Sequence, residues 1–238
     1  MEIIIIRMNI LVLLDGSYKE EFTLRYALYR ALPERDTVFI LTVFSEGVLY
    51  YYDAVPKVKD LLRHDIKGHI DRATKIVREE GKGIDAYVLE EEGDIYKVLE
   101  RVTKREAIDI IYAPPSYKAI VNSRINCPIA IIPGTILVPL DHEDLPEGSV
   151  DLLATEAKMS SSSIYLLGIV PIHIYSANER EELEEIKKKT TANVKSIGKR
   201  LARAHIQSRE ALCAGFPDEE IIKTFRELSA SIILFPQG

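Results

Sequence analysis

An internal repeat restricts the fold of this 238-residue chain more than any other feature of its sequence. Two segments of the first half return 126 residues later, and a third returns 122 residues later. The matching pairs are ILVLLD (10–15) with ILVPLD (136–141), LTVF (41–44) with LGIV (167–170), and 93–114 with 215–236. Three collinear matches at so long a period indicate a duplication. We therefore predict two homologous domains, 1–134 and 135–238.

Each half alternates short apolar runs with amphipathic segments. Runs rich in Ile and Val predict parallel strands that are buried on both faces. In the first half we expect these strands at 9–14, 37–44, 84–89, 108–112 and 129–133. One helix is predicted to open on Ser17, with Glu20 completing a capping box, and a second to stop at Gly81. Alternating strands and helices predict an α/β protein of two tandem flavodoxin-like domains, each a parallel sheet flanked by helices.

The direction of the strands suggests where a ligand would bind. In such sheets, ligands bind outside the carboxyl ends of the strands. In the first half, Asp15, Val43 and Ala113 stand at the ends of the first, second and fourth strands. The corresponding residues of the second half are Asp141, Val170 and Phe235.

Three stretches together resemble the universal stress protein family. They are ILVLLDGS at the first strand, EEGDIYKVLERVTKREAIDIIYA up to the fourth, and NCPIAIIPG at the fifth. The resemblance covers almost the whole chain, as a tandem of two such domains. It implies a HUP-type fold and a role in a stress response.

The resemblance also implies candidate nucleotide-binding residues. Family members that bind ATP carry the loop G-x2-G-x9-G-[S/T] after the fourth strand, and an Asp and a Val on the first two strands help to hold the nucleoside. Asp15 and Val43 match these two positions, and Ser116 falls on the final Ser/Thr of the loop. Pro115 stands in place of the preceding glycine, and the rest of the loop is absent.

The missing loop predicts that ATP binding is lost or weak. Pro114 and Pro115 have no backbone N–H to offer to a phosphate. A hydrogen bond to a charged group is worth roughly 1.5–3 kcal/mol, so losing about three of them costs on the order of 5 kcal/mol. Such a loss turns a micromolar site into a millimolar one. We therefore expect no resident cofactor.

A rebuilt site is the alternative. Asp15, Val43, Ala113 and Ser116 would then bind ATP, another adenine nucleotide or a small ligand, as in a sensor. Helix capping by itself also explains a serine at position 116, and Asp15 is placed to cap the turn that follows the first strand.

The net charge and the remaining motifs exclude several function classes. With 37 acidic and 31 basic residues, the chain carries a charge of −6, whereas nucleic-acid binding normally needs a basic face. No apolar run reaches the roughly 18 residues of a membrane span. The distant Cys127 and Cys213 suit buried thiols in a reducing compartment. We expect a cytoplasmic protein with neither nucleic acid nor membrane as a partner.

Catalytic motifs are also missing from the sequence. It contains no G-x-S-x-G nucleophile elbow. His142, Glu143 and Asp144 adjoin in one predicted loop, but consecutive residues do not easily converge on one metal ion. We interpret this loop as solvated and expect a non-enzymatic protein without a metal.

Association with protein is the remaining expectation. The second half ends at ILFPQG, just after its fourth strand, so we expect no fifth strand there. An exposed apolar edge strand promotes aggregation. We therefore expect 129–133 or a second chain to cover 231–235. The leader 2–6 is a further candidate for covering this edge, the alternative being that it lengthens the first strand. Apolar helix stripes predict an intramolecular pseudo-dimer of the two domains, a homodimer being the alternative.

Overall fold

A computed structural model of the chain describes residues 7–44, 56–143, 145–171 and 180–235. The chain divides into two compact units, Met1–Pro133 and Gly134–Gly238. The leader 2–6, one of the candidates for covering the second sheet, lies outside the described residues. In the part of the chain that is described, no helix combines the length and the apolar character needed to cross a bilayer.

The first unit is built on a five-stranded parallel sheet with the strand order β3-β2-β1-β4-β5. Its strands are β1 (Asn9–Leu14), β2 (Thr37–Phe44), β3 (Asp85–Glu92), β4 (Ile110–Ala113) and β5 (Ile129–Ile131). Its helices are α1 (Lys19–Ala31), α3 (Pro56–Glu80), α4 (Ile95–Arg105) and the 3-10 helix η1 (Pro115–Asn122). α3 stops immediately before Gly81, as the sequence predicts.

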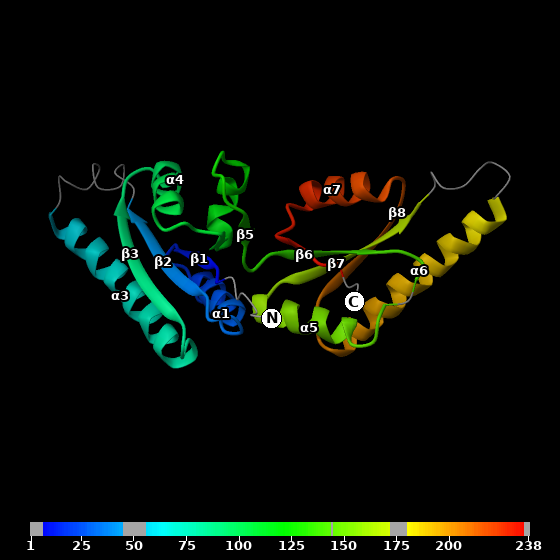
Figure 1. The fold of residues 1–238 in the computed structure, drawn as a ribbon, viewed down its shortest axis with the longest axis horizontal. Coiled ribbons are helices and arrows are strands. Elements are labelled where there is room, and N and C mark those ends of the chain that lie inside the picture. The colour runs from blue at the N-terminus through cyan, green and yellow to red at the C-terminus, as the bar shows by residue number, and fades with distance from the viewer. Residues whose placement is uncertain (1–6, 45–55, 144, 172–179, 236–238) are drawn as a thin grey trace, which may run out of the picture. The chain divides into compact units, whose positions relative to one another are not determined.

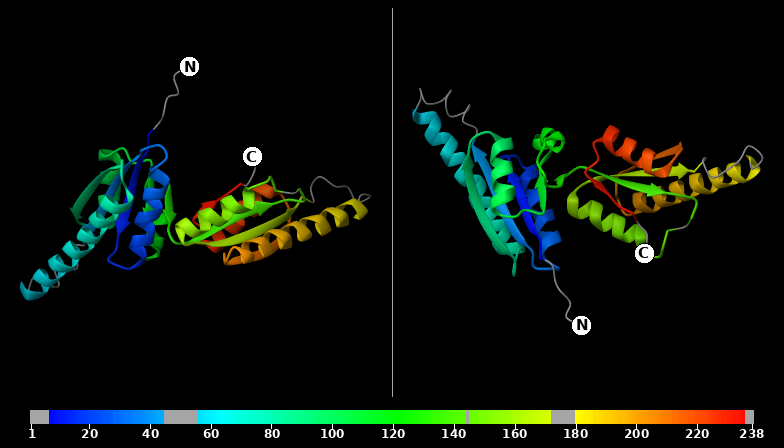
Figure 2. Two further views of the ribbon diagram at one scale, coloured as in Figure 1. Left: turned by 90° about the horizontal axis from the view of Figure 1, so that it is seen from below. Right: turned by 45° about the horizontal axis from the view of Figure 1, so that its top comes forward.

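Helices cover both faces of this sheet. α1 and α3 lie on one face, and α4 with η1 lies on the other (Figures 1 and 2). Leu11 and Leu13 of β1 pack in one cluster with Leu99 of α4 and Ile120 of η1. Since successive side chains of a strand point to opposite faces, Leu14 faces α1 and α3. Both faces of β1 are buried, which explains its unbroken apolar run.

The second unit repeats this architecture on a four-stranded parallel sheet with the order β8-β7-β6-β9. Its strands are β6 (Thr135–Leu140), β7 (Ser163–Val170), β8 (Ser208–Ala214) and β9 (Ile232–Ile233). Its helices are α5 (Ser149–Ser160), α6 (Arg180–Arg203) and α7 (Pro217–Leu228). α5 and α6 cover one face and α7 covers the other (Figure 1). The predicted fold class, two parallel sheets flanked by helices, is confirmed.

The duplication is also visible in the pairing of the strands. The registers of the two sheets are related by the offsets of 126 and 122 found in the sequence. The equivalent pairs are Leu11–Phe39 and Leu137–Tyr165, Leu41–Leu89 and Leu167–Ala211, and Leu11–Ile111 and Leu137–Ile233. The offset changes between the second and third strands of the repeat. Equivalent strands of the two units are therefore paired in the same register.

The ladder between β6 and β9 is shorter than its counterpart between β1 and β4. β6 pairs with β9 through Ile136 and Leu137 only, whereas β1 pairs with β4 through three residues. The Leu137 carbonyl accepts a hydrogen bond from the Leu234 N–H at 3.0 Å, so the backbone of Pro139, two residues on, also faces β9. Proline offers no N–H there, and the ladder ends. What covers the outer edge of β9 stays a prediction.

Candidate functional site

The turn after β1 brings together residues from distant parts of the first unit. Asp15 directly follows the last residue of β1, at the carboxyl edge of the sheet. Its Oδ1 accepts a hydrogen bond from the Ser17 backbone N–H at 2.9 Å, and its Oδ2 accepts one from the Ser116 hydroxyl. Both oxygens of this candidate ligand-binding carboxylate are therefore bound by the protein itself.

Ser116 lies inside η1, whose N-cap residue is Pro114. The interpretation of Ser116 as a helix cap is therefore wrong. The fixed φ of proline suits the start of a helical turn, and the Tyr117 N–H donates to the Pro114 carbonyl at 3.0 Å. Because this turn begins directly after β4, the exposed Ser116 reaches Asp15 across 101 residues of sequence.

The pKa of Tyr117 reflects its burial and the negative charge of the carboxylates around it. Its hydroxyl donates a hydrogen bond to the Leu14 carbonyl at 3.1 Å. Burial, and then the negative charges of Asp15 and Glu20, raise the pKa of Tyr117 to about 12. The same two carboxylates that disfavour a tyrosinate would also disfavour the phosphates of a nucleotide.

Glu20, in the first turn of α1, is a buried acidic side chain with 3% of its surface exposed. Its Oε2 accepts hydrogen bonds from the backbone N–H groups of Asp15 at 3.0 Å and Gly16 at 2.6 Å. The predicted capping box, in which Glu20 would pair with Ser17, is therefore wrong. The Ser17 N–H is already bound to the Asp15 carboxylate, so Glu20 reaches further back towards β1.

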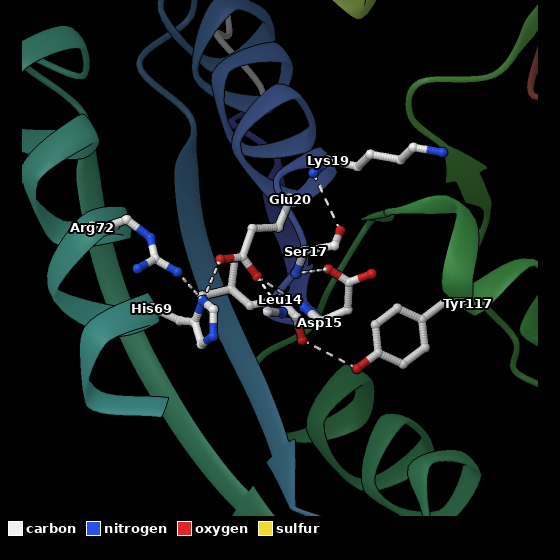
Figure 3. A network of polar contacts seen from close by, with 9 residues as sticks. Leu14, Asp15, Ser17, Lys19, Glu20, His69, Arg72 and Tyr117 are labelled. Carbon is white, nitrogen blue, oxygen red and sulfur yellow. Dashed lines mark hydrogen bonds and ion pairs between the residues drawn. The ribbon is translucent and has the colours of Figure 1, made fainter. Parts of the chain in front are cut away.

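Two residues of α3 complete this network. His69 Nδ1 lies 3.1 Å from Glu20 Oε1, and the Arg72 guanidinium contacts the same ring nitrogen. Figure 3 shows Asp15 and Tyr117 on one side of the end of β1, with His69 and Arg72 on the other. Sequence reasoning missed both residues of α3. A single histidine on a helix carries no pattern that links it to a glutamate 49 residues earlier.

The two apolar candidates of the first unit belong to its core. Val43, near the end of β2, is partly buried against the cluster of residues under α4. Ala113 ends β4 and is fully buried, and its carbonyl accepts a hydrogen bond from the Ile132 N–H at 2.9 Å. The structure thus brings Asp15 and Ser116 into contact, whereas Val43 and Ala113 contribute packing.

The candidate residues of the second unit lie in different surroundings. Asp141 follows β6, and its Oδ1 accepts a hydrogen bond from the Glu143 N–H at 2.8 Å. Asn193 of α6 donates to the Asp141 and Glu143 carbonyls at 3.3 and 2.6 Å, which holds this loop. Val170 ends β7 and is buried, whereas Phe235 follows β9 and is 60% exposed. Among the described residues, no hydrogen bond joins these three positions.

The contacts of the first unit define what its site can do chemically. Asp15 and Ser116 form a carboxylate–hydroxyl pair that can exchange hydrogen bonds with a polar ligand. The imidazole of His69 lies on the other side of the end of β1 (Figure 3). Within the ranges that the structure describes, no three His, Cys, Asp or Glu side chains gather around a metal position.

Comparisons with known proteins give structural matches only. No protein-family model matches the chain, and no curated protein sequence does so either. A putative universal stress protein from Pseudomonas aeruginosa is 16% identical with a TM-score of 0.42, and the match covers 97% of this chain and 82% of that one.

Two further structures match about half of the chain. A protein of the universal stress protein family from Burkholderia pseudomallei is 21% identical with a TM-score of 0.42, over 52% of this chain and 95% of that one. Universal stress protein UspA from Lactobacillus plantarum is 18% identical with a TM-score of 0.40, over 53% of this chain and 99% of that one. The strand order and registers described above, rather than these matches, define the fold of the present chain.

Proposed function

We propose that this chain is a non-enzymatic, tandem universal stress protein-like module that acts in a stress response through protein association. In this proposal its binding of ATP is lost or weak. The family assignment is supported by the sequence stretches at the first, fourth and fifth strands, and by two parallel sheets with matching registers.

One observation in particular supports the proposed loss of ATP binding. The Asp15 carboxylate, which would face a nucleoside, is bound by Ser17 and Ser116 of the same chain. Ser116 approaches it because Pro114 and Pro115 start η1 where ATP-binding family members have a glycine-rich loop. A ligand would have to replace these internal hydrogen bonds and would find no proline N–H in exchange. The negative charges of Asp15 and Glu20 add repulsion.

A thermal-shift titration with ATP tests this proposal. About 1 mM ATP should raise the melting temperature by less than about one degree, because a ligand near or below its dissociation constant stabilises little. A shift of about five degrees or more at this concentration would contradict the proposal.

A sensor for a nucleotide or another small ligand is the second candidate function. Its support is that Asp15 is partly exposed and Ser116 exposed, so their pair lies within reach of solvent. If any nucleotide stabilises the protein, Ser116→Ala should abolish the shift. Ser123→Ala, at the other end of η1, is the matched control because the Ser123 hydroxyl has no hydrogen-bond partner in the described part of the chain.

A further inference from the structure

Glu20 fills a hole lined by backbone N–H donors of the turn after β1 and by the His69 ring of α3. The N–H groups of Asp15 and Gly16 both point at Glu20 Oε2, at 3.0 and 2.6 Å, and His69 Nδ1 lies 3.1 Å from Oε1. Successive N–H groups turned to one point form a concavity that binds anions. Arg72, in contact with the His69 ring, adds a positive charge beside it (Figure 3).

Gly16 lies in the turn that forms this hole. It has a φ of +80°, a left-handed conformation that favours glycine. A Cβ atom at this position would lie 2.9 Å from His69 Nε2, so the ring can lie this close only because the residue is glycine. The two backbone donors therefore depend on the turn, and Glu20 is only their occupant.

Thr42 supplies an unused polar group at the same edge of the sheet. It lies opposite Leu14 in the β1–β2 register, and only 9% of its surface is exposed. Among the described residues, its hydroxyl oxygen has no hydrogen-bond partner. Phe39 and Leu41 face α4, so strand alternation places Thr42 on the face that α1 and α3 cover, which is the face of Glu20 and His69.

We propose that the turn after β1 is a carboxylate-binding site that Glu20 occupies from within the chain, closing it to external small carboxylates. A buried carboxylate needs such donors, since an unpaired buried charge is strongly unfavourable. Removing the Glu20 carboxylate should therefore leave the donors in place and open the site. This inference does not rest on the proposed function, which concerns Asp15 and Ser116 on the other side of the end of β1 (Figure 3).

Chemical rescue of Glu20→Ala tests the proposal. This change removes a carboxyl group and one methylene, which acetate replaces in size and charge. Sodium acetate at about 100 mM should raise the melting temperature of Glu20→Ala by about 3 °C more than sodium chloride at the same ionic strength. The unchanged protein and Glu21→Ala should respond equally to the two salts. Glu21 is a matched control because its partly exposed carboxylate pairs with Arg25 instead.

A folded Glu20→Ala protein that acetate stabilises no more than chloride would overturn the proposal. If that variant does not fold, Glu20→Gln decides the question, since its amide fills the same space without charge. Charge-assisted hydrogen bonds are shorter and stronger. The Gly16 amide proton should therefore resonate upfield in Glu20→Gln compared with the unchanged protein. An unchanged Gly16 resonance would rule out the carboxylate hole.

Discussion

Gly16 is the residue on which the turn after β1 depends. Its φ of +80° is strained for any residue with a side chain, and a Cβ atom at this position would lie 2.9 Å from His69 Nε2. Gly83 has a similar φ of +91°, but no atom lies within 4 Å of the place where its Cβ would be. The two glycines thus share the backbone strain and differ in the space around them.

Replacing each glycine by alanine separates these two effects. Gly83→Ala should cost about 1 kcal/mol of unfolding free energy, which is the strain of the left-handed backbone. Gly16→Ala should cost about 1–3 kcal/mol more, because the new methyl group displaces a ring held by Glu20. Urea unfolding of both variants measures the difference. Equal losses would mean that the His69 contact does not restrain the turn.

At the scale of secondary structure elements, β3 is an edge strand held to α4 by charge. The Glu91 carboxylate of β3 binds Arg101 and Arg105 of α4, with N–O distances of 2.6 and 2.7 Å. Hydrogen bonds from Arg105 and then Arg101 lower the pKa of Glu91 below its ordinary value of 4.5. Since the Glu91 side chain is only 16% exposed, solvent screens this carboxylate less than its two arginine partners.

The ion pairs of Glu91 with Arg101 and Arg105 predict a pH-dependent contribution to stability. Glu91→Gln should lower the unfolding free energy at neutral pH by about 1 kcal/mol or less. Because the Glu91 pKa is lower in the folded state, the contribution is present above pH 4.5 and is lost as the pH falls through the folded value. Denaturant unfolding near pH 7 and near pH 3 should therefore show the two proteins converging in acid.

Glu100→Gln is the control for this series. It breaks the exposed pair of Glu100 with Lys104 on the same helix, and solvent screens both partners of that pair. Its effect at neutral pH should be smaller than that of Glu91→Gln. A loss in Glu91→Gln that stays constant from neutral to acid pH would assign the effect to packing rather than to charge.

At the scale of the whole molecule, the second unit exposes apolar side chains, as the proposed protein association requires. Several of its large side chains are about half exposed or more, namely Leu152, Phe216, Ile222 and Phe235. Among the described residues, β9 pairs with β6 alone, so one edge of the second sheet has no partner strand. Exposed sheet edges are normally covered in native proteins.

We predict that residues 134–238 expressed alone will self-associate, whereas the full chain at the same concentration will do so less. The reason is that the separated unit would expose any apolar surface that the first unit covers in the pseudo-dimer. Sedimentation velocity across a concentration series measures this. A monomeric, soluble and cooperatively folded second unit would contradict the pseudo-dimer.

The amino-acid sequence by itself determined the two-domain α/β organisation. Apolar runs, helix stripes and the stop at Gly81 are local patterns, and a duplication is visible without any coordinates. The offsets of 126 and 122 residues also anticipated the strand registers, because homologous strands that keep their buried faces cannot slip by one residue. Asp15 was a candidate site residue from its place after the first strand, and Ser116 from the family resemblance; their role in a ligand site stays a prediction.

Only the tertiary structure decided what these residues bind. Ser116 and Asp15 are 101 residues apart, and His69 is 49 residues from Glu20, so no local pattern records these contacts. Glu20 had an acceptable local partner in Ser17, but the Asp15 carboxylate took that N–H, and the glutamate turned to Asp15 and Gly16. A buried carboxylate needs hydrogen-bond donors. Which donors are available to it is decided only when the sheet and its helices have packed.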